Sequence, residues 1–407
     1  MNRAAAEQLT LATLDKEWRT YVEPMLALAE HTGALLSDPK DPQQRAELYQ
    51  QLFKTTSMSY LALFLGDPQH PDFWPIFNQA YSLGATNPDA AYCIAPLEGN
   101  GTYKISGFRG TVRMIDFQIG MGQFYPRGQG GLAPSIVNYD IDSLHIGNDS
   151  SFEVIASSKR PEHYTGDWWH LDPRATHVFV RQVAYDWLRE VDGRLAIERL
   201  DRPAMRPRPS IQELQANLQQ ISSSAQNYLA LSTGMLKRYL KEGLINRVTV
   251  RDLAGAGGFV DIKQLYIEGL IDIDDDEALI FEMQIPRRCR YWNLQTTDGL
   301  WNAVDYVNRQ SSLNGHTARL DADGRFRAVI SAHDPGVPNW LDTGGYRQGS
   351  VFGRLLECDS VPTPTVTRVR LADVREHLHS ATPSITADQR DAALRIRRKG
   401  AQLRRRW

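Results

Sequence analysis

The stretch that decides the fold runs from Arg287 to Leu356 and reads RRCRYWNLQTTDGLWNAVDYVNRQSSLNGHTARLDADGRFRAVISAHDPGVPNWLDTGGYRQGSVFGRLL. Apolar and polar residues alternate in short runs, as they do along strands whose successive side chains point to opposite faces. Turn signals separate the runs: Asp323-Gly324 favours a tight hairpin, and His333–Gly336 marks a second turn. The stretch therefore predicts antiparallel strands.

The first of these runs carries arginine and tryptophan on one face of its strand: Arg288, Arg290, Trp292 and Leu294. Cys289, Tyr291 and Asn293 fall on the other face. An arginine is almost never fully buried without a partner. We therefore expect the face with the arginines either to be solvated or to line a cavity that holds an acid or an anionic ligand.

Working outward, the same two-residue period recurs over 91–96, 102–108, 111–119, 142–146, 151–156, 177–187 and 194–200. Short strands at this spacing are typical of an antiparallel sandwich or barrel. We predict a mainly β fold with helical additions: a jelly-roll-like sandwich built from two β-rich halves. The expected regions are a helical N-terminal region at 1–84, a first β half at 85–200, a helical insertion at 201–277, a second β half at 278–372 and a basic helix at 383–407.

Helix signals appear at three places. Residues 5–65 have helical spacing, and Asp41-Pro42 supplies an N-cap and a first helical residue. Ser210 with Glu213 forms a capping box ahead of an apolar stripe that Gly243 ends, and Thr386 with Gln389 forms another. The central helix would either cover the sandwich or form a dimer contact. Its stripe is too irregular for a coiled coil, which favours the cover.

Composition limits the function classes. The chain has 407 residues, of which 42% are hydrophobic and 23% charged, and its formal net charge is -2. This charge gives no general attraction to nucleic acid. Three widely separated cysteines favour a reducing compartment without a disulfide framework. There is no signal-peptide pattern and no apolar run of membrane-spanning length, so we expect a cytoplasmic protein without a membrane partner.

The C-terminal segment is the most basic part of the chain, with arginines at 390, 395, 397, 398, 404, 405 and 406. One interpretation is a helix that binds nucleic acid or another anionic surface. The other is a tail helix that packs Leu394 and Ile396 while its charges face water or acidic patches. No aromatic platform lies among the arginines, which favours the second interpretation.

Several short blocks resemble a known family. They are Asn87-Pro88-Asp89, Gly101–Val112, Phe152–Val154, Gly166–Trp168, Val180-Arg181, Asp186-Trp187 and Asn339–Leu341. Together with the arginine-rich tail they resemble the longer members of the bacterial β-sandwich family called "domain of unknown function twelve-fourteen". The resemblance implies a jelly-roll-like sandwich in a soluble protein, within catabolic repertoires for hydrophobic compounds. It brings no agreed catalytic motif, and the helical N-terminus stands in place of the usual upstream domain.

Motifs of common enzymes are absent from the sequence: there is no nucleophile elbow, phosphate loop, dinucleotide fingerprint or zinc spacing. We expect no organic cofactor. Metal binding through His163, His170, His177 or His333 stays an open alternative, although their spacing does not favour it.

The stronger candidate is a pocket of arginines and tryptophans. Its expected ligand-binding residues are Arg113, Arg181, Arg290, Trp187, Trp292, Asn339 and Trp340, and its expected acid–base residues are Asp116 and His333. Apolar walls with a few placed polar groups are typical of small-molecule sites. The alternative is that these residues form structural ion pairs and plain core.

Two functions follow from this pocket. The first is a catabolic lyase, isomerase or hydrolase for an aromatic or polycyclic substrate whose acid or carbonyl group arginine would bind. The second is a non-catalytic ligand-binding or scaffold protein that uses the sandwich surface and the basic tail. Under either hypothesis the partner is a small hydrophobic ligand, with a homo-oligomer possible and no nucleic acid expected, although binding through the basic tail stays a weaker third idea.

Overall fold

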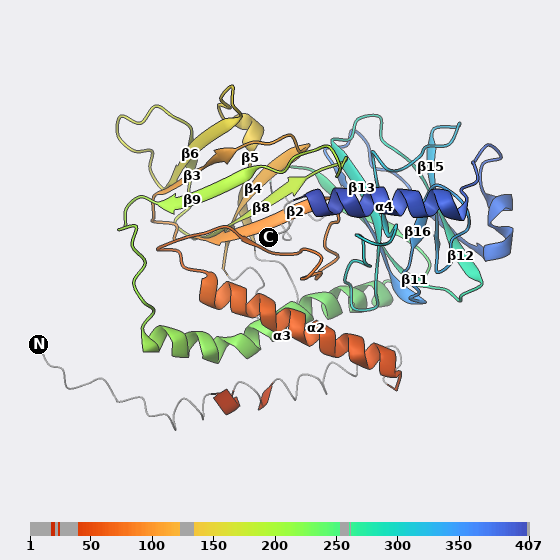
Figure 1. Cartoon of the computed structure of the whole chain (residues 1–407), viewed down its shortest axis with the longest axis horizontal. Helices are drawn as coiled ribbons and strands as arrows, with labels where there is room; N and C mark the ends of the chain where they lie inside the picture. Colours follow the sequence, from red (N-terminus) through yellow and green to blue (C-terminus); the bar gives the residue numbers. More distant parts are fainter. Residues whose placement is uncertain are drawn as a thin grey trace, which may run out of the picture.

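The computed structural model describes residues 18–20, 23–24, 40–122, 134–252, 260 and 262–404. Two β-sandwiches lie side by side, with two long helices along one side of the pair and a third helix laid across both (Figure 1). The prediction of a mainly β chain in two β-rich halves is confirmed. Each half closes a sandwich of its own, whereas the sequence led us to expect one sandwich shared by both.

The first half packs a five-stranded sheet against a four-stranded one. In strand order the five-stranded sheet holds β1 (Trp74–Pro75), β2 (Ala90–Pro96), β8 (Ala175–Val183), β4 (Met114–Met121) and β5 (Ser135–Asp140). The other sheet holds β7 (Trp168–His170), β6 (Ser151–Ser157), β3 (Tyr103–Phe108) and β9 (Arg194–Arg199). Alternation sends Phe117, Val154 and Val180 into the space between the sheets, where they are fully buried.

The second half has the same construction. Its five-stranded sheet holds β10 (Thr249–Asp252), β11 (Gln264–Asp272), β17 (Gln348–Leu356), β13 (Tyr291–Thr297) and β14 (Ser312–Asn314). Its four-stranded sheet holds β16 (Trp340–Asp342), β15 (Arg325–Ser331), β12 (Glu277–Gln284) and β18 (Thr365–Arg370). Strands β10 and β11 fall inside the predicted insertion 201–277, so this half begins at Thr249 rather than at 278.

The two halves are structural copies of each other. Every strand of the first half has a counterpart at the same place in the second, so that β2 corresponds to β11, β4 to β13 and β8 to β17. The detail repeats as well: Ser157 and Ser331 occupy equivalent ends of β6 and β15, and each hydroxyl donates to the carbonyl two residues on, at 2.8 Å. The five-stranded sheet of each half faces the other half, and we call these two the inner sheets.

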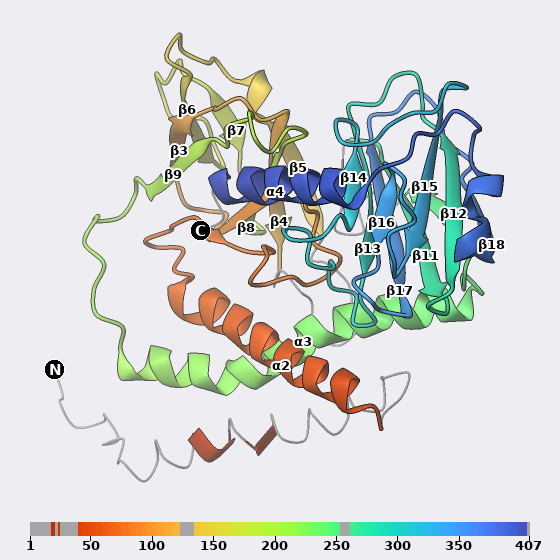
Figure 2. The ribbon, with the colours of Figure 1, turned by 45° about the vertical axis from the view of Figure 1, so that its right-hand side comes forward.

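Two long helices cover the underside of both sandwiches (Figure 2). Helix α2 (Pro42–Tyr60) begins at the predicted Asp41 cap and continues into a π-helical turn, Leu61–Leu65. Helix α3 (Ile211–Lys241) begins at the predicted capping box and is followed by Gly243 at a φ of +68°. Tyr228 and Leu231 of α3 are buried against the β structure. This confirms the covering role predicted for α3, while most of the helix predicted ahead of Asp41 lies outside the described residues.

Helix α4 (Ala387–Leu403) crosses both sandwiches like a strap (Figures 1 and 2). Arg390, Arg397 and Arg404 recur every seventh residue and point along one face. Arg390 binds Asp334 of the second half at 2.9 Å, and Arg404 binds Asp192 of the first half at 2.6 Å. Arg397 lies 4.5 Å over the Trp187 ring. Three arginines of the basic tail are therefore used inside the molecule, two of them on acidic side chains. The expectation that Leu394 and Ile396 form the packing face is wrong, because Ile396 is exposed and the arginines face inward.

Two local expectations differ from the structure. Residues 142–146 form no strand, because the strand pairing with β4 is β5, and a 3-10 turn at Ile141–Ser143 follows it. Further 3-10 structure lies at Leu371–His377. Cys289 and Cys358 form a disulfide, because Tyr291 pairs with Leu356 in antiparallel register and so places the two cysteines opposite each other. The cysteine argument for a reducing compartment therefore no longer holds.

No helix in the described part of the chain has the length and apolar character needed to cross a membrane.

Candidate functional site

A cavity of about 110 Å³ lies between the two inner sheets. Its walls come from β2, β4 and β8 of the first half and from β11, β13 and β17 of the second, and α3 and the loops at 77–87 and 301 close one side. Arg181 and Arg354 are its charged wall residues, one from each half. Aromatic side chains dominate the rest of the wall: Phe77, Tyr92, Phe179, Tyr266, Tyr291 and Trp301.

Strand alternation explains why these side chains meet. Along β8, Val178 and Val180 point into the sandwich core, so Phe179 and Arg181 point to the opposite face, toward the other half. The register makes Tyr92 and Asp116 the cross-strand neighbours of Arg181.

The second half has the same arrangement of cross-strand neighbours around its arginine, with one residue type replaced. Arg354 has Tyr266 and Asn293 as its cross-strand neighbours. The guanidinium groups also sit alike, Arg181 at 4.6 Å from the Phe179 ring and Arg354 at 4.7 Å from the Phe352 ring. Asn293 therefore stands where the first half has Asp116.

The arginine of the first half is neutralised. Arg181 binds the Asp116 carboxylate at 3.1 Å, and the Asn138 amide donates to both carboxylate oxygens at 3.0 and 3.1 Å. Burial disfavours the ionised carboxylate more than Arg181 favours it, and the pKa of Asp116 rises to about 6. Asp116 lies behind Arg181 and does not line the cavity itself.

The arginine of the second half has no carboxylate. Arg354 is only 8% exposed, and it donates to the Ala85 carbonyl at 2.6 Å and to Gln295 Oε1 at 3.0 Å. Among the residues with described positions, no acidic group lies within ion-pair distance of it. A buried charge without an opposite charge is costly, and two neutral acceptors compensate it here.

Further polar groups near Arg354 have unused hydrogen-bonding capacity. Gln264 Oε1, on the cavity wall, and Asn293 Oδ1, one strand away, are buried and have no hydrogen-bond partner in the described structure. Burial raises the pKa values of Tyr266 and Tyr291, so both phenols are neutral donors at ordinary pH. The two amide oxygens are acceptors and Tyr291 already donates its proton to Asp89, so among these groups Tyr266 is the phenol donor on the cavity wall.

The backbone beside the cavity is strained. Phe77, Ala85 and Trp301 have φ values of 53°, 50° and 62°, a region that side chains rarely occupy. Phe77 and Trp301 line the cavity, and the Ala85 carbonyl holds Arg354. Each such residue costs about 1–3 kcal/mol, and strain of this kind concentrates at binding sites.

A second buried cluster ties the halves together next to the cavity. The Asp89 carboxylate accepts hydrogen bonds from the Tyr291 hydroxyl at 2.7 Å, from Asn314 at 2.7 Å and from the Trp187 indole at 2.9 Å. Burial raises the pKa of Asp89. The Asn87-Pro88-Asp89 block thus has a joining role, and the cluster fixes Tyr291 on the cavity wall.

The three arginines named from the sequence do not share one cavity. Arg113 and Arg290 meet at the edge of the contact between the halves, where the Arg113 guanidinium donates to the Arg290 carbonyl. Arg290 also pairs with Asp140 at 2.6 Å and with Glu357 at 3.1 Å. Only Arg181 reaches the cavity, and its partner there is Arg354, which the sequence did not single out.

The predicted tryptophan walls and the predicted histidine lie elsewhere. Trp292 is buried in the core of the second sandwich, Trp187 packs beneath α4, and Trp340 donates to the Ser331 carbonyl at 3.1 Å. His333 lies on an exposed turn. The sequence led us to expect Arg288, Arg290, Trp292 and Leu294 on one strand face, but β13 begins only at Tyr291, so the two arginines lie ahead of the strand. Within β13 this face, with Trp292 and Leu294, points into the core of the second sandwich.

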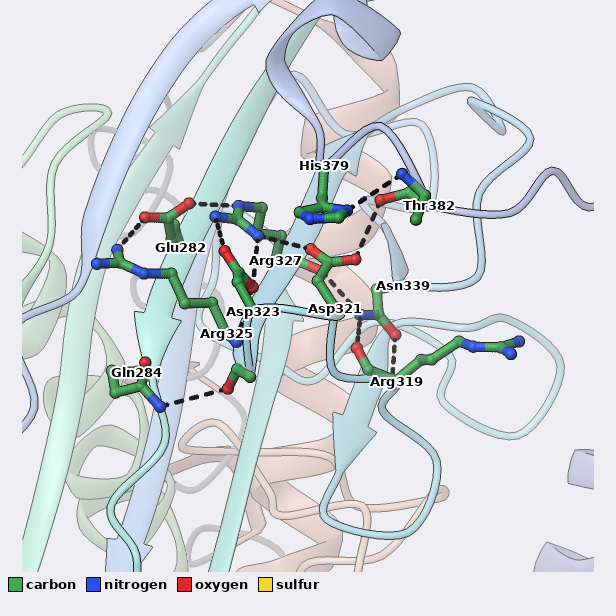
Figure 3. A network of polar contacts seen from close by, with 12 residues as sticks. Glu282, Gln284, Arg319, Asp321, Asp323, Arg325, Arg327, Asn339, His379 and Thr382 are labelled. Carbon is green, nitrogen blue, oxygen red and sulfur yellow. Dashed lines mark hydrogen bonds and ion pairs between the residues drawn. The ribbon is translucent and has the colours of Figure 1, made fainter.

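Asn339 belongs to a polar network at the far end of the second sandwich (Figure 3). Its amide donates to the carbonyls of Arg319 at 2.6 Å and Arg327 at 2.8 Å, and its oxygen accepts from the Arg319 N–H at 2.8 Å. Beside it, Arg327 pairs with Glu282, Asp321 and Asp323. Asn339 acts as a backbone clamp here.

Asn339→Ala should therefore lower the free energy of unfolding by about 2–3 kcal/mol, because backbone groups lose their partner. Chemical denaturation measures this, with Asn308→Ala, which removes an exposed amide bonded to Asp305, as the control of small effect. If Asn339→Ala lost ligand binding but kept the stability of the wild type, the structural role of Asn339 in holding the backbone would be contradicted.

No group of three or more histidine, cysteine, aspartate or glutamate side chains is arranged to hold a metal ion among the residues the structure places. His177, one of the histidines considered from the sequence, is buried on β8 beside Thr176.

Comparison with known proteins adds to the fold but not to the chemistry. The chain is similar to an uncharacterized protein from Burkholderia cenocepacia at 26% identity and a TM-score of 0.79, over 88% of this chain and 97% of that one. A protein from Vibrio parahaemolyticus matches at 12% identity and a TM-score of 0.45, over 78% and 96% of the two chains. A salicylate 1,2-dioxygenase from Pseudaminobacter salicylatoxidans matches at 8% identity and a TM-score of 0.18, over 81% and 84%. The last two similarities are too low to support any conclusion. No family model and no curated protein matches the chain.

Proposed function

We propose that the cavity between the inner sheets binds a compact organic anion, with its carboxylate on Arg354. The observation that carries the proposal is the buried Arg354 guanidinium, which meets a cavity wall without a carboxylate beside it. It has more N–H donors than its two protein acceptors engage. A carboxylate would take these donors in a bidentate pair.

The size of the cavity limits the ligand. A volume of 110 Å³ is smaller than the roughly 150 Å³ of an apolar cavity that binds benzene. This favours an acid with roughly four to six non-hydrogen atoms over the polycyclic substrate considered from the sequence. The aromatic wall would hold the apolar part of such an acid, as in other small-molecule sites.

Arg354→Met tests the proposal. We expect the variant to lose at least about a hundredfold in affinity for short monocarboxylic acids such as propionate and butyrate, because a desolvated charge-assisted pair is lost. Isothermal titration calorimetry measures the affinities. Arg390→Met is the matched control, because it removes a buried arginine that binds the same half away from the cavity. Wild-type protein that binds none of these acids would end the proposal.

A catalytic role is the second candidate, and one observation favours it. Asp116 has a pKa of about 6, close to neutrality, as general acids and bases require. Arg181 lies between Asp116 and the cavity and cannot pass on a proton, so Asp116 would have to reach the bound acid directly, in lyase, isomerase or hydrolase chemistry. The catalytic role would be supported if the wild type converts a bound acid and Asp116→Asn still binds that acid but no longer converts it.

We also propose, from the quoted sequence blocks, membership of the family called "domain of unknown function twelve-fourteen".

A further inference from the structure

The two arginines of the cavity form a matched pair. Each lies at the same register position of its inner sheet, beside a tyrosine on one neighbouring strand. The tyrosines repeat as well, with centroids of the Tyr92 and Phe179 rings 5.4 Å apart and those of Tyr266 and Phe352 also 5.4 Å apart. The cavity would therefore present two equivalent anion positions if nothing else distinguished the halves.

One carboxylate distinguishes them. On the other neighbouring strand, the first half has Asp116, which binds Arg181 at 3.1 Å, and the second half has the neutral Asn293. Asparagine and aspartate have nearly the same shape, so the difference between the two positions is mainly one of charge.

The remaining charges near the cavity are balanced. Glu268 follows Tyr266 on the same face of β11, and it is bound by Arg238 at 2.7 Å and Arg251 at 3.1 Å. Asp89 is separated from the cavity by the Tyr291 hydroxyl and lies in the field of Arg397. Arg354 is therefore the unbalanced charge of the described cavity wall.

We infer that the site selects ligands with a single negative charge, and that Asp116 imposes this selection by occupying the anion position of Arg181. This inference rests on the proposed function. A monocarboxylate places its charge on Arg354 and its uncharged end toward the Arg181–Asp116 pair. A dicarboxylate would bring its second charge against the Arg181–Asp116 pair, where Asp116 already neutralises the guanidinium from behind and leaves no net positive charge to bind it.

Exchanging the two residues tests the inference. Asp116→Asn should remove the opposite charge from Arg181 and raise the affinity for dicarboxylates about tenfold or more, while monocarboxylates change little. Asn293→Asp should copy the ion pair of the first half onto Arg354 and lower monocarboxylate affinity about tenfold or more. Asp142→Asn is the control, because it removes a carboxylate of the first half that pairs with Arg109 outside the cavity.

The probes are propionate and malonate, which share a three-carbon chain, with butyrate and succinate to vary the spacing of the charges. Calorimetry at pH 7.5 on the full chain gives the affinities, and circular dichroism verifies that each variant is folded. Because the two variants lie in different halves, either one alone decides the matter if the other does not fold.

The outcomes separate the two claims. Suppose that the wild type binds monocarboxylates through Arg354. The charge selection is then overturned, and the binding function stands, if Asp116→Asn leaves the affinity for dicarboxylates unchanged or if Asn293→Asp binds monocarboxylates as well as the wild type does. Wild type that binds neither class overturns both. A reciprocal shift in the two variants establishes the selection.

Discussion

Replacing Arg404 by methionine is expected to lower the free energy of unfolding by about 3–5 kcal/mol, because it leaves a buried aspartate without its opposite charge. Arg404 and Asp192 are both almost fully buried, and their side chains meet at 2.6 Å where α4 ends. The same guanidinium donates to the carbonyls of Asp89 at 2.7 Å and Gln182 at 3.0 Å. Denaturation in urea with fluorescence detection measures the loss.

Two variants calibrate this result. Arg395→Met removes an arginine of the same helix that pairs with Asp391 at the surface, and should cost less than about 1 kcal/mol. The double variant Arg404→Met with Asp192→Asn should recover part of the loss, since the stranded charge is gone. An Arg404→Met protein as stable as the Arg395→Met control would mean that the end of α4 does not dock as described.

Asp116→Asn should change how stability depends on pH. Burial holds the pKa of Asp116 at about 6 in the folded protein, against an ordinary value of 3.8. The folded state therefore keeps the proton longer than the unfolded state, and ionisation of Asp116 removes stability as the pH rises from 3.8 to 6. A shift of about two pH units corresponds to about 3 kcal/mol. Relative to wild type, Asp116→Asn should thus gain about 3 kcal/mol between pH 4 and pH 7.

The free energies of unfolding of wild type and Asp116→Asn are measured across this pH range and subtracted. The contributions of the other titrating groups, which both proteins share, cancel in this difference. Asp142→Asn supplies a control of opposite sign, because the hydrogen bond from Arg109 lowers the pKa of Asp142. That carboxylate adds stability once it is ionised, so its replacement should be more harmful at high pH. Parallel curves for Asp116→Asn and wild type would contradict the buried, protonatable carboxylate.

The fold could be predicted largely from local patterns. The caps at Asp41, Ser210 and Thr386 start the three helices as expected, since capping depends only on residues a few positions apart. The alternation along 177–187 also placed Phe179 and Arg181 on one face. Local patterns do not say how sheets associate, so the closing of two sandwiches in place of one was not predicted.

The site was harder to predict because it depends on the contact between the halves. Arg181 and Asp116 were named from the sequence as mid-strand charges, but Arg354 was not, although it too is a charge between apolar residues in the run at 350–356. The signal that would have found it is the match between Phe179–Arg181 and Phe352–Arg354. Arg113 and Arg290 passed the same sequence criterion, yet they lie at the rim, where paired surface arginines are common.

The repeated architecture also gives the molecule an internal control for substitutions. A substitution at one register position can be compared with its twin some 170 residues further along, in the same preparation and under the same conditions. The cavity itself belongs to neither copy, because each contributes one wall. A break in the Pro-rich connection at 201–209 would thus leave every strand intact, and any ligand signal from the cut protein would report that its two pieces had come back together.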